Sequence, residues 1–129
     1  MAELLILAHG ATWEMRFQVT SLAASEAAAG AKVEIALFFG ALDRWMNGWD
    51  EVDPAPPVSA ARVEAANFPA LSEMLAPGRA EGLIRLYACS TSSRLLGLDT
   101  AAVQQRVDAI LGWQSFSRMI REAGRVVTF

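Results

Sequence analysis

The chain has 129 residues, 53% of them hydrophobic and 19% charged, with a formal net charge of −3 at pH 7. This length and apolar content are typical of one folded domain with a sizeable core, and we expect residues 1–129 to form that single domain. The mild acidity argues against a nucleic-acid partner, because phosphate binding needs a concentrated basic face and the 11 Lys and Arg residues are scattered.

The sequence also favours a soluble cytoplasmic protein. The start, MAELLILAHG, lacks the basic residues of a signal peptide, and no apolar run approaches the ~20 residues of a membrane helix. The single cysteine cannot form an internal disulfide, which fits a reducing compartment. We therefore expect no membrane partner.

The first part of the chain predicts a strand, a helix and a second strand. The apolar run Glu3–Ala8 is typical of a strand buried on both faces, and Lys32–Phe39 is a second such run. Between them, Thr12 can cap a helix that Gly30 would end. Short joints make this a βαβ unit, so the first two strands should be parallel.

From Ala41 to Asn67 the periodicity is lost. Three prolines, Pro54, Pro56 and Pro57, argue against a regular helix or central strand. Long loops in compact domains are usually lids or subunit contacts. Trp45 and Trp49 fall in this stretch, and we expect them at an oligomer interface rather than in a ligand cage.

The second half again alternates helices and strands. Phe68–Ala76 predicts a helix that begins near Pro69 and is interrupted at Pro77-Gly78. The later elements are a third strand at Leu83–Ala88, a short helix at Ser92–Leu96, a helix capped by Asp99 or Thr100 and ending near Arg106, a fourth strand at Val107–Leu111, an amphipathic helix carrying Trp113, Phe116, Ile120 and Ala123, and a last strand at Arg125–Phe129. Five strands alternating with helices predict a three-layer α/β/α sandwich around a mostly parallel five-stranded sheet, without fixing the strand order.

Cys89 is the leading candidate for chemistry. It stands where the third strand ends and a Ser-rich helix start begins, and ligands of parallel α/β proteins bind beyond the carboxyl ends of strands. The hydroxyls of Ser90, Thr91 and Ser92 can cap the helix, and a helix N-terminus stabilises a thiolate. We therefore expect a displayed, reactive thiol. The alternative is an inert core residue, because free cysteine is among the most buried residue types.

The segment LYACSTSSRLLGLD (Leu86–Asp99) resembles the DsrE/DsrF-like family of small sulfur-metabolism proteins. The opening LLILAHG and VEIALFFGAL, and the ending VDAILGWQSF followed by RVVTF, are similar to that family as well, so the likeness covers nearly the whole chain. The resemblance implies a flavodoxin-like domain that forms homo-oligomers, often trimers or hexamers. It also implies that Cys89 accepts sulfane sulfur from a donor protein as a persulfide and passes it to an acceptor protein.

Other residues expected at the same sheet edge are His9, Gly10 and Gly40. His9 ends the first strand and would act as a base or hydrogen-bond a bound anion if its strand lay beside that of Cys89; otherwise it simply ends its strand. Gly10 and Gly40 either let the backbone approach a small ligand or serve turn geometry. With Ser90, Thr91 and Ser92 they make up the expected ligand-binding set.

We expect no cofactor and no metal. Neither glycine-rich phosphate-binding motif, GxxxxGK[ST] or GxGxxG, occurs. The acidic residues Asp50, Glu51 and Asp53 lack histidine or cysteine at ligand spacing and are typical of a solvated loop.

Three functions remain open from the sequence. The leading one is a sulfur carrier or sulfurtransferase-like protein with Cys89 as the catalytic acceptor, and the lack of a second cysteine suits a carrier because no internal thiol can resolve the persulfide. The second is a non-catalytic module that binds a small ligand at the edge marked by His9, Gly40 and Cys89. The third is a redox-sensing thiol that forms a sulfenic acid.

Overall fold

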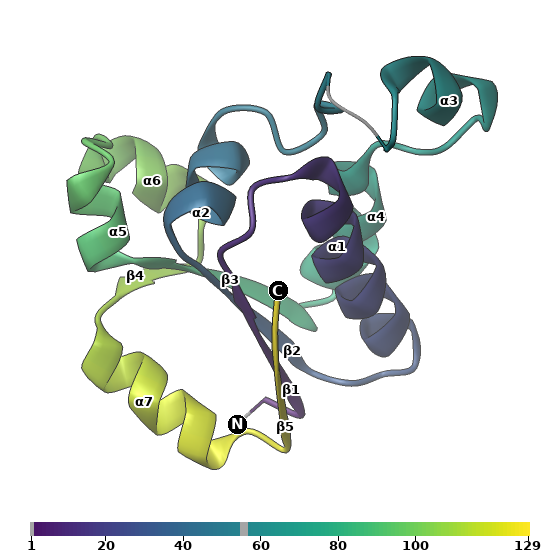
Figure 1. Ribbon diagram of the computed structural model, residues 1–129. Helices are drawn as coiled ribbons and strands as arrows, with labels where there is room; N and C mark the ends of the chain where they lie inside the picture. Colours follow the sequence, from purple (N-terminus) through teal and green to yellow (C-terminus); the bar gives the residue numbers. More distant parts are fainter. Residues whose placement is uncertain (1, 55–56) are drawn as a thin grey trace.

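The computed structural model describes residues 2–54 and 57–129, and a sheet of five parallel strands forms its centre (Figure 1). The strands are β1 (Leu4–Ala8), β2 (Val33–Leu37), β3 (Ile84–Cys89), β4 (Ala109–Leu111) and β5 (Arg125–Thr128). They lie in the order β4-β3-β2-β1-β5, and every neighbouring pair is parallel. Helices lie on both faces, so the expected three-layer α/β/α sandwich of flavodoxin-like kind is confirmed.

Where the sequence contains a recognisable capping residue, the helix lies close to its predicted position. The helices are α1 (Trp13–Ala28), α2 (Phe39–Met46), α3 (Ala60–Ala65), α4 (Leu71–Ala80), α5 (Ser90–Leu95), α6 (Thr100–Arg106) and α7 (Trp113–Glu122). Thr12 caps α1 by accepting the Met15 N–H at 3.2 Å, and Asp99 caps α6 by accepting the Ala102 N–H at 3.1 Å. Among the residues described, none of the helices has the length and apolar character needed to cross a bilayer.

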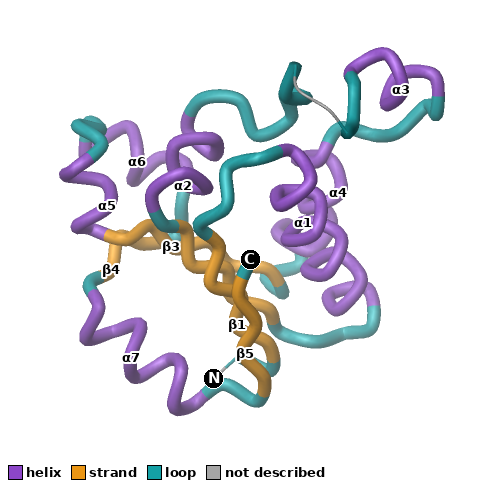
Figure 2. The backbone as a smooth tube through the Cα atoms, viewed as in Figure 1, coloured by secondary structure: helices purple, strands orange, loops and turns teal. Residues whose placement is uncertain are grey.

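The direction of each connection decides which face of the sheet its helices cover. From β1 through β2 and β3 to β4 the chain moves steadily to one side, so right-handed crossovers place α1, α4 and α6 on the same face. The return from β4 to β5 crosses the whole sheet in the opposite direction, and a right-handed crossover then places α7 on the other face. Figures 1 and 2 show α7 lying apart from all the other helices, on the far side of the strands.

We call the two sides of the sheet the first face and the second face. The first face carries Leu4, Ile6 and Ala8 of β1, Val33, Ile35 and Leu37 of β2, and Ile84, Leu86 and Ala88 of β3. All nine are at most 2% exposed, and they pack against α1, α2, α4 and α6. The second face carries the alternate residues, among them Leu7, Ala36, Tyr87 and Cys89, which pack near α7.

The segment after β2 corrects the prediction that residues 41–67 lack regular helices. α2 begins at Phe39, inside the predicted strand, and runs to Met46, before the first proline. α3 is a short helix capped by Ser59, after the prolines, and it stands away from the sheet (Figure 1). Pro56 lies outside the described residues. The prolines therefore separate two helices instead of removing them.

The tryptophans of this segment are core residues, which corrects their predicted place at an interface. Trp45 and Trp49 are each 4% exposed and pack edge to face with ring centroids 5.4 Å apart. The Trp49 indole N–H donates to the Thr20 hydroxyl at 3.2 Å, and the Trp45 indole N–H donates to the Arg106 carbonyl at 2.9 Å. The expectation failed because Trp45 lies on the inward side of α2, and the turn after α2 brings Trp49 back onto the Trp45 ring.

A buried arginine fixes the acidic loop that follows α2. Arg16 of α1 is 0% exposed, and its guanidinium donates to the carbonyls of Ala11, Trp49 and Glu51 and to the carboxylate of Asp53. Desolvation by burial is the main cause that lowers the pKa of Arg16. Asp53 is therefore an ion-pair partner in this loop, and not the solvated residue that the sequence suggested.

Two further predictions fail for packing reasons. α4 continues through Pro77 to Ala80, and Gly78 allows its close approach to the sheet, since a Cβ there would lie 2.4 Å from Ile84 Cδ1. Trp113 was expected in the core stripe of the last helix, but it is 54% exposed. Phe116, three residues later, is fully buried in its place.

Candidate functional site

The second face is only partly covered because one helix must span it. α7 starts after Gly112, beside the carboxyl end of β4, and ends near the amino end of β1, where the Gly124 N–H donates to the Ala2 carbonyl at 3.1 Å. This diagonal course leaves hollows on both sides of the helix. One of them, which we call the apolar groove, has a volume of about 400 Å³ and is lined by Leu7, His9, Phe38, Phe39, Trp113 and Thr128.

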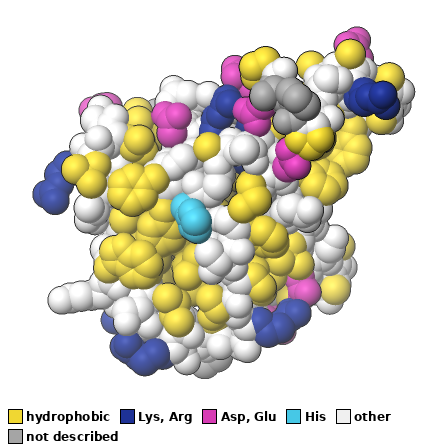
Figure 3. Space-filling view, viewed as in Figure 1, with side chains coloured by type: hydrophobic (Ala, Val, Ile, Leu, Met, Phe, Trp, Pro, Cys, Tyr) yellow, Lys and Arg dark blue, Asp and Glu magenta, His cyan; other side chains and the backbone are white. Residues whose placement is uncertain are grey.

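The apolar groove lies where the strand order reverses. β1 is followed in sequence by its neighbour β2, whereas β5 joins β1 on the opposite side at the end of the chain. Ligands of open parallel sheets bind at this reversal, outside the carboxyl ends of the strands. His9 directly follows β1, and Thr128 ends β5. In Figure 3 the single histidine stands beside a group of hydrophobic side chains on this surface.

Stacked aromatic rings form one wall of the apolar groove. The rings of Phe38 and Trp113 have centroids 5.1 Å apart and planes inclined by 25°, and Phe116 packs behind both. Trp13, Trp45 and Trp49 are at most 9% exposed, so Trp113 is the tryptophan that faces solvent. The wall offers a flat, rigid apolar surface on which a planar molecule can stack.

Phe39 lines the same groove in a strained backbone conformation. Its φ is +37°, a region that costs non-glycine residues of order 1–3 kcal/mol, and its side chain is 47% exposed. Nearly half of this residue faces water, so the ring is only partly buried. A large apolar side chain kept in such a position is typical of a functional site.

His9, Gly10 and Gly40 meet at the loop beside the groove. The His9 backbone N–H donates to the Phe129 carbonyl at 2.9 Å, and the side chain is exposed and lines the groove. A Cβ on Gly40 would lie 2.8 Å from the Ala11 Cβ and 3.0 Å from the His9 carbonyl oxygen. The two glycines thus allow close packing of the loops, and neither lines the apolar groove.

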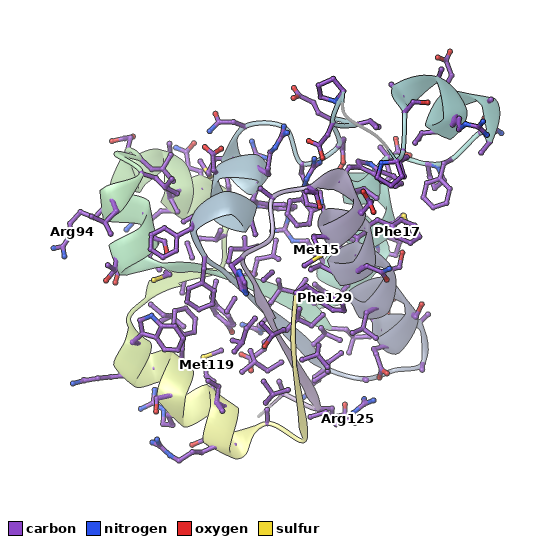
Figure 4. All side chains as sticks on the ribbon, in the orientation of Figure 1. Met15, Phe17, Arg94, Met119, Arg125 and Phe129 are labelled. Atoms are coloured by element: carbon purple, nitrogen blue, oxygen red, sulfur yellow. The ribbon has the colours of Figure 1, made fainter. Side chains whose placement is uncertain are left out.

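Cys89 is 1% exposed, which corrects the expectation of a displayed thiol. It is the last residue of β3, and alternation along the strand directs it to the second face, where it packs in one buried cluster with Ala36, Phe38 and Phe116. Figure 4 shows Met119, another α7 residue beside this cluster, lying between the helix and the sheet. The sequence placed the thiol at a strand end correctly but could not show that α7 covers it.

The residues of the Ser-rich segment after Cys89 differ in their exposure and in their contact with the thiol. Cys89 itself is the N-cap of α5, and its sulfur accepts the Ser92 N–H at 3.4 Å. The Ser92 hydroxyl is buried without a hydrogen-bond partner among the described residues. Ser90 and Thr91 are exposed. β2 separates β1 from β3, so His9 and Cys89 do not stand on neighbouring strands.

The second hollow beside α7 is polar, and sequence reasoning missed it. It has a volume of about 380 Å³, and its lining includes Lys32, Glu34, Arg85 and Tyr87. Burial raises the pKa of Tyr87 to about 12, and a hydrogen bond to Glu34 adds to this effect. The available signal was the polar residues Glu34 and Arg85, which interrupt two otherwise apolar strands and pair in register.

Comparisons with known proteins do not extend this description. No protein-family model matches the chain, and no curated protein matches it. Within residues 2–54 and 57–129, no three His, Cys, Asp or Glu side chains gather in a way that would hold a metal ion. The candidate site therefore rests on the geometry of the second face.

Proposed function

We propose that the protein binds a small, planar and mostly apolar molecule in the apolar groove and acts as a ligand-binding or regulatory module. The observation that carries this proposal is the position of Phe39, a half-exposed aromatic residue in a left-handed conformation at the reversal of the strand order. The groove has the volume of a small-molecule site, which is typically ~300–1,000 Å³.

The chemistry of the lining defines the ligand. The exposed Trp113 ring, backed by Phe38, offers a stacking surface, and Leu7 and Phe39 add apolar contact. His9 and Thr128 are the polar side chains of the groove, and both lie at its carboxyl edge. A fused or single aromatic ring with one hydrogen-bonding or anionic group directed at His9 fits this distribution.

A second copy of the chain is the competing occupant of the groove. Stable protein interfaces bury about 800 Å² on each partner, which is more than one concave hollow provides. Oligomers of this protein, including trimers or hexamers, remain compatible with a groove that binds a small molecule. Measuring the molecular mass in solution and the ligand binding of the same sample distinguishes a bound small molecule from a second copy.

Trp113 provides the direct assay. Because the other three tryptophans are buried, acrylamide should quench mainly Trp113, and a bound ligand should protect it. The probe is 1-anilinonaphthalene-8-sulfonate, whose fused rings and single sulfonate match the lining. We expect saturable binding that protects Trp113, and about 3- to 10-fold weaker binding in Trp113→Ala and in Phe39→Gly.

The matched control is Phe68→Ala. Phe68 is also a partly exposed phenylalanine, at 38%, but it packs on Trp13 and Phe17 away from the groove. Its replacement should leave probe binding unchanged. Equal loss in all three variants would overturn the proposal. If sedimentation shows that the chain associates, and if Trp113 becomes protected from acrylamide as the protein concentration rises without probe, the groove is assigned to a second copy.

A second candidate function is the sulfur carrier with Cys89 as acceptor, expected from the resemblance to the DsrE/DsrF-like family. The observation that favours it is local: the Ser92 N–H already points at the sulfur, and the buried Ser92 hydroxyl has no partner among the described residues. That hydroxyl could donate to the outer sulfur of a persulfide. The proposal places the protein in the cytoplasm with donor and acceptor proteins as partners.

The transfer is a balanced exchange. The Cys89 thiolate attacks the outer sulfur of a donor persulfide, R–S–SH, a new S–S bond forms at Cys89, and the donor leaves as the thiolate R–S⁻. The proton of the donor persulfide passes to the new Cys89 persulfide, and no external oxidant is needed. Because Phe38 and Phe116 pack on Cys89, a donor can reach the sulfur only when this cluster opens.

Mass spectrometry after treatment with a small persulfide donor tests the carrier. The expected product is one added sulfur on Cys89 in the native protein, absent in Cys89→Ser. Reaction only under unfolding conditions would reject the carrier and leave the groove proposal intact. A sulfenic acid trapped by dimedone after peroxide would instead indicate the redox sensor.

A further inference from the structure

A separate hollow lies between α5 and α6, away from the apolar groove. It has a volume of about 280 Å³ and is lined by Ser90, Ser93, Arg94, Leu98, Thr100 and Ile110. Ser90, Ser93 and Arg94 are three and four residues apart on α5, so they share one face of that helix. Leu98 and Ile110 pack against the core cluster of the first face, whereas the apolar groove lies on the second face.

One hydroxyl group of this hollow, that of Ser93, is not used in the hydrogen bonding of the part of the chain that the structure describes. Ser93 is 6% exposed, yet its side chain makes no hydrogen bond to any described residue. Ser93 is absent from the fully enclosed orphan hydroxyls, which are those of Ser21 and Ser92, so its oxygen keeps an opening toward the hollow that it lines. The Ser93 hydroxyl is therefore free to donate a hydrogen bond to a ligand in the hollow.

Arg94 supplies the charged side chain in the lining of this hollow. Arg94 forms no ion pair with a described acid, and Figure 4 shows its side chain extended away from the body of the protein. Part of the Arg94 side chain lines the hollow, and an anion bound there requires its flexible guanidinium end to turn toward the mouth. The nearest carboxylate in sequence, Asp99, is engaged as the N-cap of α6 by the Ala102 N–H.

We propose that this hollow binds a small oxyanion, either free phosphate or sulfate or the equivalent group of a larger molecule. The Ser90, Ser93 and Thr100 hydroxyls supply neutral donors, and the Arg94 guanidinium supplies a charged fork that matches the oxyanion geometry. The site uses side chains from two helices, and it is independent of the proposed ligand of the apolar groove.

Titration with inorganic phosphate, followed by amide NMR shifts at constant ionic strength, tests this site. We expect saturable shifts that cluster at residues 90–94 and 98–101. Arg94→Gln should weaken binding about tenfold, and Ser93→Ala should weaken it severalfold. Because Arg94 is exposed, Arg94→Gln should fold normally. Its effect on phosphate binding therefore tests the proposal even if Ser93→Ala is unstable.

Two variants serve as matched controls. Thr91→Ala removes an exposed hydroxyl from the same helix outside the hollow, and Arg85→Gln removes an exposed arginine from the second face. Neither should change phosphate binding. The proposal fails if shifts do not saturate, if they cluster elsewhere, or if Arg94→Gln and Arg85→Gln weaken binding equally. A phosphorylated small molecule that binds more tightly than phosphate would identify the larger-molecule source.

Discussion

The two faces of the sheet are built from the same strands but covered very differently. On the first face several helices enclose a continuous core, and its inward residues Leu71 and Leu75 of α4 are at most 1% exposed. On the second face α7 alone covers a four-residue cluster that includes Cys89, and hollows lie on both sides of it. The first face forms the enclosed core, whereas the second face leaves open hollows on its surface.

This difference follows from the strand order. Three consecutive crossovers in one direction bring their helices to the first face, and one return crossover brings a single helix to the second. A ten-residue helix is about 15 Å long and cannot cover five strands spaced about 4.8 Å apart together with both ends of the sheet. Open surface beside α7 is therefore a consequence of the topology.

The largest expected effect comes from removing the anchor of α7. Phe116→Ala should lower the free energy of unfolding by about 3–5 kcal/mol, because the ring is fully buried and leaves a cavity. It should also make Cys89 react with an alkylating reagent much faster than the protein unfolds, since Phe116 packs in the cluster that covers the thiol. Denaturant unfolding and native-state alkylation measure the two effects.

Leu75→Ala is the first-face counterpart of this variant. It should cost about 2–5 kcal/mol, but alkylation of Cys89 should remain limited by opening on the second face. If both variants expose the thiol equally, the two faces open as one unit, and the distinction between them is wrong.

A smaller effect on stability is expected at Phe39, where glycine and alanine should rank in the reverse of their usual order in a helix. Phe39→Gly should be more stable than Phe39→Ala by about 1–2 kcal/mol, because the left-handed backbone strains every residue with a Cβ. At an ordinary helical position the order is reversed, and Ala101→Gly in α6 should lower stability by up to about 1 kcal/mol. Denaturant midpoints of the three variants check this. Phe39→Ala as stable as Phe39→Gly would show that the strain is absent.

The smallest effect concerns Tyr87 at the polar hollow. Its pKa in the folded protein, about 12, lies above the value of an unfolded tyrosine, so the fold favours the neutral phenol. This contribution to stability is complete below about pH 10 and is lost as the pH rises toward 12. Tyr87→Phe should therefore lose less stability over this interval than the wild type.

The chain contains one tyrosine, so its alkaline titration can be followed directly by tyrosinate absorbance. A midpoint near that of free tyrosine would contradict a partly buried phenol bonded to Glu34. It would also mean that water reaches the Tyr87 phenol in the polar hollow.

The local architecture of this protein could be predicted from its amino-acid sequence. Continuous apolar runs predicted buried parallel strands, and Thr12 and Asp99 marked helix starts that the structure confirms. Cap residues and apolar periodicity act over a few neighbouring residues, which is why they are readable in one dimension. The place of Cys89 at a strand end was readable for the same reason.

The surroundings of each of these residues could not be predicted in this way, because they depend on how the strands and helices pack. The order β4-β3-β2-β1-β5 places β2 between His9 and Cys89, sends α7 alone across the second face, and covers the thiol with Phe116. It also brings Trp113 to the surface and carries Trp45 and Trp49 into the core. Burial depends on contacts between residues far apart in the chain, and strand order and crossover direction set those contacts without leaving a local pattern.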